Sequence, residues 1–229
     1  MTTMTAWAKR WLRDNRQVLA FLLLLGVFRT AVADWNPIPS GSMRPTLLEG
    51  DVVYVNRLAY DARLPLTDVV VARIGEPRRG DVVTFFSPQN GTRLIKRIAG
   101  VPGDTVEMRG KHLFVNGRVA GYAGEHVAPE PLGDGRSTNA LHVEEDIAGA
   151  RHEIQWLSQR MPQDDFGPIA IPPDRYLVLG DNRDDSEDSR FFGLVPRDRL
   201  IGRAVRILAS ADVNGSWQPR FDRFGRRLD

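Results

Sequence analysis

Cysteine is absent from this chain of 229 residues. Its absence excludes disulfides, thiolate metal ligands and a cysteine nucleophile. Histidine is scarce, and the four present, His112, His126, His142 and His152, follow no common metal-ligand spacing, so we expect no metal site and no cofactor. The formal net charge of +2 is too small to imply nucleic-acid binding. The length suits one domain with an anchor or an insertion and excludes a long repeat array.

Lysine is nearly absent as well. Only three of the 31 cationic residues are lysines, namely Lys9, Lys96 and Lys111, so the chain uses arginine for almost every positive charge. A lysine kept in such a chain is a candidate for a task that arginine cannot perform. A buried lysine can lose its proton and act as a base, whereas a guanidinium stays charged.

The chain begins with a basic flank followed by an apolar run. Residues 1–16 carry four cationic side chains against one acid, and residues 18–28 are apolar. This pattern predicts a cytoplasmic N-terminus at 1–16 and a transmembrane anchor at 17–33. The segment is shorter than the roughly 20 residues of a full span, so the prediction depends on snorkelling by Arg29. A cleavable secretory signal with its cleavage site after 31–33 fits the same pattern.

Beyond the apolar run, the sequence predicts an all-β protein with an antiparallel sheet. Short apolar or β-branched runs, each bounded by Gly, Pro, Asn or Asp, occur at 51–55, 69–72, 81–86, 94–99, 112–115, 176–179 and 204–207. A polar segment rich in Gly and Pro interrupts them. We therefore expect a β-domain in two parts, 34–120 and 174–212, with an insertion or subdomain at 121–173 and a polar, solvated tail at 213–229.

Three polar clusters could carry chemistry, and the first is the loop 39–47. Ser40 and Ser42 flank Gly41 in this loop, which Pro and Gly residues punctuate. One hydroxyl could attack a carbonyl while the other, with a backbone N–H, donates to the oxyanion. An ordinary Ser/Gly/Pro loop is the alternative interpretation.

The second cluster, 93–104, contains Lys96 within a predicted strand. Strand alternation puts Lys96 on the same face as Leu94 and Ile98, which is the more apolar face. Burial there would lower the pKa of Lys96, so a neutral amine able to activate a serine could exist near pH 7. The alternative is a lysine whose stem packs on the sheet while its ammonium reaches water.

The third cluster, 180–190, follows the predicted strand 176–179 and is rich in hydrogen-bonding groups. Such a cluster suits a shell that orients a catalytic lysine. A calcium loop is the competing interpretation, but the EF-hand template fails because Ser186 stands where it requires Gly and Phe192 where it requires Glu.

Together, the three clusters behind an N-terminal apolar segment resemble bacterial signal peptidase I, the Ser/Lys family of leader peptidases. The matching stretches are 38–47, 78–81, 95–104, 113–117 and 180–196. The resemblance implies a serine endopeptidase without metal or cofactor. It implies these roles: Ser42 as nucleophile, Lys96 as general base, Ser40 and the Ser42 N–H as oxyanion donors, Ser186 holding the lysine amine, and Asp188 with Arg190 as a supporting ion pair.

The resemblance also implies a substrate surface and a cellular location. Shallow substrate pockets would be built by Ile38, Met43, Leu47, Leu94 and Ile95. Asn36 departs from the family, which often has a large apolar residue there, and the chain has one apolar segment where some relatives have two. The implied substrates are signal peptides of exported preproteins, cut after Ala-x-Ala. The implied location is the bacterial cytoplasmic membrane, with the anchor retained, the catalytic domain on the extracytoplasmic side and the secretion translocon nearby.

Other interpretations remain open at this point. A Ser/Lys peptidase dedicated to conjugative transfer would share the dyad and the fold. A self-cleaving repressor would need a DNA-binding helical module, which the sequence lacks. A catalytically silent, membrane-tethered β-domain that binds exported chains is the third alternative, and the lysine scarcity and the third cluster argue against it.

Overall fold

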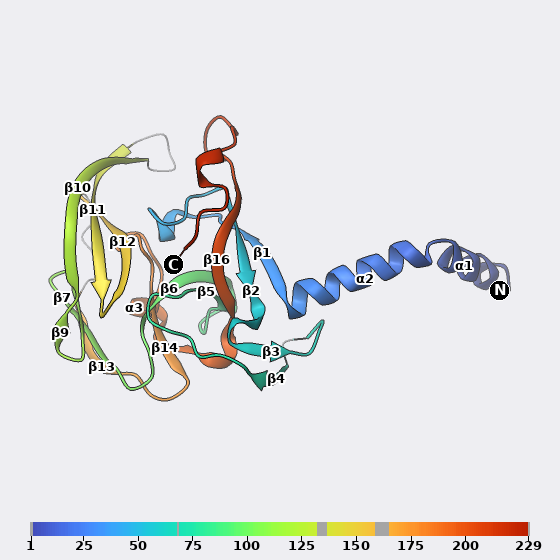
Figure 1. Ribbon diagram of the computed structural model, residues 1–229, viewed down its shortest axis with the longest axis horizontal. Helices are drawn as coiled ribbons and strands as arrows, with labels where there is room; N and C mark the ends of the chain where they lie inside the picture. Colours follow the sequence, from blue (N-terminus) through green and yellow to red (C-terminus); the bar gives the residue numbers. More distant parts are fainter. Residues whose placement is uncertain (1, 68, 132–136, 159–164, 229) are drawn as a thin grey trace.

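A computed structural model describes residues 2–67, 69–131, 137–158 and 165–228. It begins with two helices, α1 (Thr2–Asp14) and α2 (Arg16–Ala31), which project away from a body made of strands (Figure 1). None of the helices in the described ranges is both long enough and apolar enough to cross a membrane. The helical part of the predicted segment 17–33 ends at Ala31, because strand β1 (Ala33–Pro37) starts two residues later and Arg29 pairs with Asp34 at 2.8 Å.

The body is built on a seven-stranded sheet in the order β1-β2-β16-β5-β6-β14-β15, with every neighbouring pair antiparallel. Its other strands are β2 (Asp51–Asn56), β16 (Leu200–Ser210), β5 (Val82–Phe86), β6 (Arg93–Gly100), β14 (Arg175–Leu179) and β15 (Val195–Pro196). The prediction of an all-β protein with antiparallel pairing is therefore confirmed. Each of the seven predicted runs overlaps a strand.

Two apolar cores pack on the seven-stranded sheet. The first contains Ile38, Met43, Leu47, Val53, Val55, Val82, Ala204, Ile207 and Leu228. The second contains Tyr60, Val83, Phe85, Ile98, Tyr176, Val178, Val195 and Leu200. Successive residues of β5 enter different cores, since Val82 belongs to the first and Val83 to the second, as strand alternation requires. The central strands are thus covered on both faces, which makes them a firm support for a site.

Three smaller sheets complete the body. A sheet of four strands has the order β13 (Phe166–Ala170), β7 (Thr105–Arg109), β8 (His112–Val115) and β9 (Arg118–Val119). A sheet of three long strands, called the small sheet below, consists of β10 (Gly121–Pro131), β11 (Ser137–Ile147) and β12 (Ala150–Leu157) and stands apart from β16 (Figure 1). A hairpin, β3 (Asp61–Arg63) with β4 (Val70–Arg73), completes the set.

The segment 121–173, which we expected to interrupt the series of strands, contains strands of its own. Strands β10, β11, β12 and β13 lie there, although residues 132–136 and 159–164 of the predicted insertion lie outside the described residues. The sequence analysis missed β10 because most of its residues are exposed. It therefore carries polar, Gly and Pro residues where a half-buried strand would alternate apolar with polar side chains. The domain boundaries themselves stay a prediction.

The C-terminal tail is also less solvated than predicted. Arg223 is 5% exposed and forms an ion pair with the buried Asp51 of β2 at 2.6 Å. Leu228 joins the first core. One arginine and one leucine give no periodic signal, and the partner of Arg223 lies far away in the sequence, so the expectation of a solvated end was wrong at both residues. Residue 229 lies outside the described ranges.

Candidate active site

The structure brings Ser42 and Lys96 together. Ser42 lies in the short 3₁₀ helix η1 (Gly41–Met43), and Lys96 lies in the middle of β6. The Lys96 Nζ is 2.7 Å from the Ser42 Oγ. Only 3% of Lys96 is exposed, although it carries an ionisable group. This hydrogen bond between an amine and a hydroxyl is the arrangement that a serine nucleophile and its base require.

Burial changes the protonation of Lys96. Desolvation lowers its pKa from 10.5 to about 8, because the protonated amine has lost most of its contact with water. The negative charges of Asp188, Asp181 and Glu187 oppose this effect, and Arg190 adds to it. With a pKa of about 8, about a tenth of the Lys96 amine is neutral at pH 7, far more than for an exposed lysine.

The turn that carries Ser42 is held from two sides. Asn182, in the third cluster, donates from its backbone N–H to the Ser42 carbonyl at 3.1 Å and from its side-chain amide to the Gly41 carbonyl at 3.1 Å. Met43 anchors the other side in the first core, where it is fully buried. The sequence analysis did not single out Asn182. Its position directly after a predicted strand was the one available signal.

Gly180 is a second residue that the sequence analysis missed. A Cβ atom there would lie 2.2 Å from the Ser186 Oγ and 2.5 Å from the Ser42 carbonyl oxygen. Such distances are far below van der Waals contact, so only glycine fits between the third cluster and the turn that carries Ser42. The requirement is one of space, since the backbone of Gly180 does not lie in the left-handed region.

Asp188 and Arg190 form a buried ion pair beside this turn. The Arg190 Nε and Nη2 each lie 2.8 Å from an oxygen of Asp188. Asp188 also accepts a hydrogen bond from the Gly180 N–H at 2.9 Å. The pair therefore fixes the loop after β14 relative to the glycine that touches Ser42.

Ser186 lies in the same cluster but makes no hydrogen bond with the Lys96 amine. It is 9% exposed, and its Oγ has no hydrogen-bond partner among the described residues. Its predicted bond to Lys96 is thus not formed in this arrangement. Ser40, in contrast, is exposed, and its Oγ lies 3.5 Å from the Ser42 Oγ.

The residues predicted to bind substrate differ in exposure. Ile38, Met43 and Leu47 are buried in the first core. Leu94 and Ile95 are half-buried, with Ile95 packed on the first core and Leu94 on the second. Only these last two offer surface to a ligand.

One free strand edge lies beside the dyad. Strand β6 pairs with β5 over Arg93–Arg97, but β14 pairs with β6 only from Arg97 to Gly100. In the described ranges, the β6 residues before Arg97 therefore have no strand partner on the side away from β5. Their backbone groups are available to an added strand.

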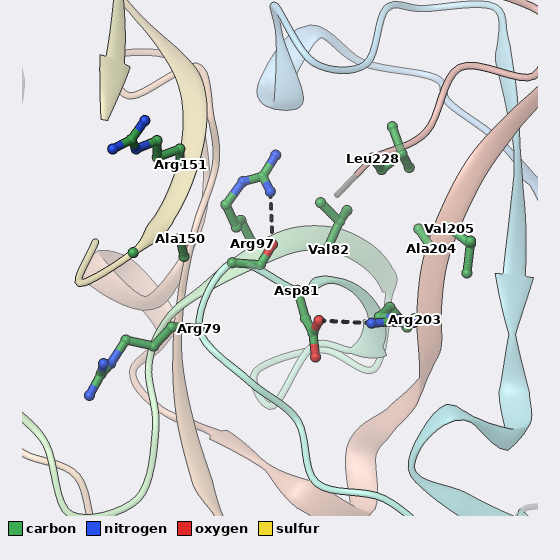
Figure 2. A pocket seen from close by; sticks show the side chains of 12 residues that line it. Arg79, Asp81, Val82, Arg97, Ala150, Arg151, Arg203, Ala204, Val205 and Leu228 are labelled. Carbon is green, nitrogen blue, oxygen red and sulfur yellow. Dashed lines mark hydrogen bonds and ion pairs between the residues drawn. The ribbon is translucent and has the colours of Figure 1, made fainter. Parts of the chain in front are cut away.

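A cavity of about 380 Å³ lies between the seven-stranded sheet, called the main sheet below, and the small sheet (Figure 2). Arg97 lines it and donates to the Gly80 carbonyl at 2.8 Å, and Arg203 reaches Asp81 at 3.4 Å (Figure 2). Arg97 also forms a buried ion pair with Asp181 at 2.7 Å. Neither residue of the dyad is among the described residues that line this cavity, so it is distinct from the site around Ser42 and Lys96.

Asn36, the noted departure from the family, is buried. Its side-chain oxygen accepts a hydrogen bond from Arg93 at 2.8 Å, and Arg93 also pairs with Asp34 at 2.9 Å. The polar residue is thus accommodated by a charged partner at the start of β6.

Comparisons with known proteins give one family. A sequence profile described as "Signal peptidase, peptidase S26" matches residues 8–209. A Signal peptidase I of Pseudomonas fluorescens is 36% identical over 219 residues, which cover 89% of this chain and 75% of that protein. A Signal peptidase I of Pseudomonas aeruginosa is 37% identical over 217 residues, with the same coverage of both chains. A crystal structure of a signal peptidase I from Enterococcus faecalis V583 aligns with 28% identity and a TM-score of 0.37, covering 57% of this chain and 97% of that one.

Proposed function

This chain belongs to the signal peptidase family S26, a family of serine endopeptidases that remove signal peptides, and we propose that it cleaves them with Ser42 as nucleophile and Lys96 as general base. The observation that carries the proposal is the 2.7 Å contact between the Ser42 Oγ and the Nζ of Lys96, a lysine that is only 3% exposed. The lowered pKa of Lys96 supports it as well, because a base must be neutral before it can accept a proton.

The proposed reaction follows from these positions. The neutral Lys96 amine accepts the Ser42 hydroxyl proton while the Oγ attacks the scissile carbonyl. The resulting oxyanion receives hydrogen bonds from the Ser42 N–H and the Ser40 hydroxyl. Protonated Lys96 then gives its proton to the leaving amine, and the acyl group stays on Ser42. Water, deprotonated by the same lysine, releases the signal peptide and regenerates the serine.

We further propose that Ser186, Asp188 and Arg190 position the lysine. The Asp188–Arg190 pair holds the loop against Gly180, and the Ser186 hydroxyl has no hydrogen-bond partner among the described residues. A buried hydroxyl without a partner is unfavourable, which favours a bond that forms during the reaction.

The free edge of β6 suggests how the substrate binds. An extended peptide would add as a strand beside Leu94 and Ile95, with alternate side chains facing the enzyme. The residue before the cut and the one two positions earlier would then meet the half-buried apolar surface of Ile95, which packs on the core that contains Ile38, Met43 and Leu47. Such shallow space admits small side chains, which matches a preference for Ala-x-Ala.

Placement at the membrane is a separate proposal. The apolar side chains of α2 are exposed, including Phe21, Leu24 and Phe28. We propose that α2 anchors the chain in the bacterial cytoplasmic membrane, with Ser42 on the extracytoplasmic side and near the secretion translocon. Retention of this anchor is supported by Ala33, which is 3% exposed and paired with Asn56 of β2, so the bond after it is not accessible in the folded chain.

The anchor can be tested by fractionation. The full-length chain should stay with membranes after alkaline carbonate washing, and protease added outside spheroplasts should reach the β-body. Recovery of the intact chain in the soluble fraction would refute the anchor without affecting the proposed chemistry.

The dyad is tested with purified protein in detergent and a synthetic signal-peptide substrate. Ser42→Ala should abolish cleavage, and Lys96→Arg should lower it by about 10²-fold or more, because arginine keeps the charge but cannot become neutral. Lys111→Arg is the matched control, since Lys111 is partly exposed and pairs with Asp184 at 3.3 Å. If Ser42→Ala still cleaves, the proposed catalysis fails, and a β-domain that only binds exported chains becomes the better interpretation.

A further inference from the structure

Three side chains that are far apart in the sequence lie close together on the small sheet. His126 of β10 lies directly opposite His142 of β11 in the register, and His142 lies opposite Gln155 of β12. Glu153 is two residues before Gln155. Because side chains alternate along a strand, His126, His142 and Glu153 share one face of the sheet.

The distances within this group suit a metal ion. The Oε1 atom of Glu153 lies 3.2 Å from the His142 Nδ1 and 3.9 Å from the His126 Nε2. The candidate ligand atoms of all three residues lie within 4.8 Å of one another. In a tetrahedral zinc site with bonds of about 2.0 Å, the ligand atoms are about 3.3 Å apart. The separations of 3.2 Å and 3.9 Å are close to this value.

The orientation of the two imidazoles favours ligation. The Nδ1 of His126 lies 3.3 Å from the Gly124 carbonyl, which leaves its Nε2 lone pair facing Glu153. A hydrogen bond from one ring nitrogen to a carbonyl is the usual way in which a protein fixes a metal-binding histidine. His142 is 8% exposed, and the ring nitrogen that it turns towards Glu153 is Nδ1.

The negative charges of Glu144 and Glu153 also favour binding of a cation at this group. Glu153 lies directly opposite Glu144 in the β11–β12 register, and facing carboxylates repel each other. Among the described residues, neither carboxylate forms an ion pair with an arginine or lysine, although the chain has 31 such residues. A bound divalent cation would relieve this repulsion.

We propose that His126, His142 and Glu153 form a binding site for a divalent metal ion of the zinc class, with water completing the coordination. Two imidazoles and a carboxylate are a ligand set that Zn²⁺ accepts. The ion would join β10, β11 and β12. It would also stabilise the loop behind Ser42, because the Gln155 N–H donates to the Asp181 carbonyl at 2.9 Å and the Arg183 N–H donates to the Gln155 carbonyl at 3.0 Å.

The proposed site departs from the sequence-based expectation of no metal, which stays a prediction. The histidines are 16 positions apart in the chain, and only the strand register makes them neighbours. Spacing rules for zinc sites depend on pairs of ligands a few residues apart in the chain, so they do not detect single ligands that meet across strands.

Calorimetric titration of the full-length, metal-free chain, without an affinity tag, with Zn²⁺ tests the proposal. One ion should bind per chain. His126→Ala and Glu153→Gln should each raise the Kd by about 100-fold or more, since even residues behind the ligands contribute about 10- to 100-fold. Neither change should unfold the sheet, because the His126 side chain is 58% exposed and glutamine can still accept the hydrogen bond from His142.

His112→Ala is the matched control. The His112 Nδ1 also lies near the carbonyl two residues before it, that of Gly110 at 2.9 Å, but His112 is not in the cluster. This variant should keep the Kd of the unmodified chain. Co²⁺ provides a second readout, because tetrahedral coordination gives it strong visible absorption that His126→Ala should remove. The proposal is overturned if the chain binds neither ion at one equivalent, or if His126→Ala and Glu153→Gln bind as tightly as His112→Ala.

Discussion

The pH dependence of cleavage follows directly from the burial of Lys96. Desolvation lowers its pKa from 10.5 to about 8. With that pKa, about a tenth of the amine is neutral at pH 7, against about 0.03% for an unperturbed lysine, so burial supplies a gain of about 300-fold in active base. Below pH 8, kcat/KM should rise about tenfold per pH unit, and it should level off above pH 9.

A single surface substitution tests the electrostatic origin of this profile. Glu187 is exposed, and its negative charge raises the pKa of Lys96. Glu187→Gln should therefore shift the midpoint of the profile to lower pH. Glu125→Gln removes the same charge from an exposed position on β10 and serves as the matched control, which should leave the midpoint in place.

The assay is kcat/KM for a synthetic signal peptide in detergent, measured from pH 5.5 to 10 in buffers of constant ionic strength, because salt screens the effect of a surface charge. A profile that is flat from pH 6 to 8 would refute Lys96 as the base. A shift to higher pH with Glu187→Gln would contradict the sign of the charge effect.

Three further changes have defined outcomes. Gly180→Ala should lower kcat by about 10²-fold with the β-sheet circular dichroism unchanged, because its Cβ displaces the turn of Ser42, and intact activity would refute the close approach. Arg223→Ala should lower the free energy of unfolding by about 3 kcal/mol or more, because it leaves a buried carboxylate unpaired, while the exposed Arg226→Ala should change it by less than about 0.5 kcal/mol. Lys96→Met should raise the free energy of unfolding at pH 7 by up to about 3 kcal/mol, because a protonated lysine with a lowered pKa destabilises the folded state. This destabilisation is complete below pH 8 and declines towards pH 10.5. Denaturant unfolding at pH 7 and pH 10 measures this gain, and a gain that grows with pH would contradict the sign.

The sequence predicted the main sheet well because its central strands are buried on both faces. Runs such as 81–86 and 176–179 are apolar and bounded by turn residues, and they form β5 and β14. Strand β10 was missed because its exposed side chains give no alternation. Periodicity predicts a strand most readily where apolar and polar residues alternate, and β10 lacks that alternation.

The candidate site was predictable to a similar extent. Ser42 and Lys96 were identified from residue chemistry, lysine scarcity and a family resemblance, and the structure places them 2.7 Å apart. Asn182 and Gly180 were not identified, because their importance arises from contacts with a turn more than 130 residues away. Contacts between residues so far apart in the chain depend on tertiary packing, and no local sequence pattern predicts them.

Chemical rescue of a Lys96 variant tests the central claim most directly. Because the chain has no cysteine, a thiol introduced at position 96 can be modified selectively. Lys96→Cys introduces the only thiol, which can be alkylated under mild denaturation to carry an aminoethyl group, then refolded, with modification verified by intact mass. Lys96→Cys should be inactive, and aminoethylation should restore cleavage because it returns a titratable amine at the length of lysine. A trimethylammonium-ethyl group at the same thiol should restore none, since it keeps the charge but can never accept a proton. Equal rescue by both groups, or no rescue of fully aminoethylated and refolded protein, would contradict the account of Lys96 as the general base.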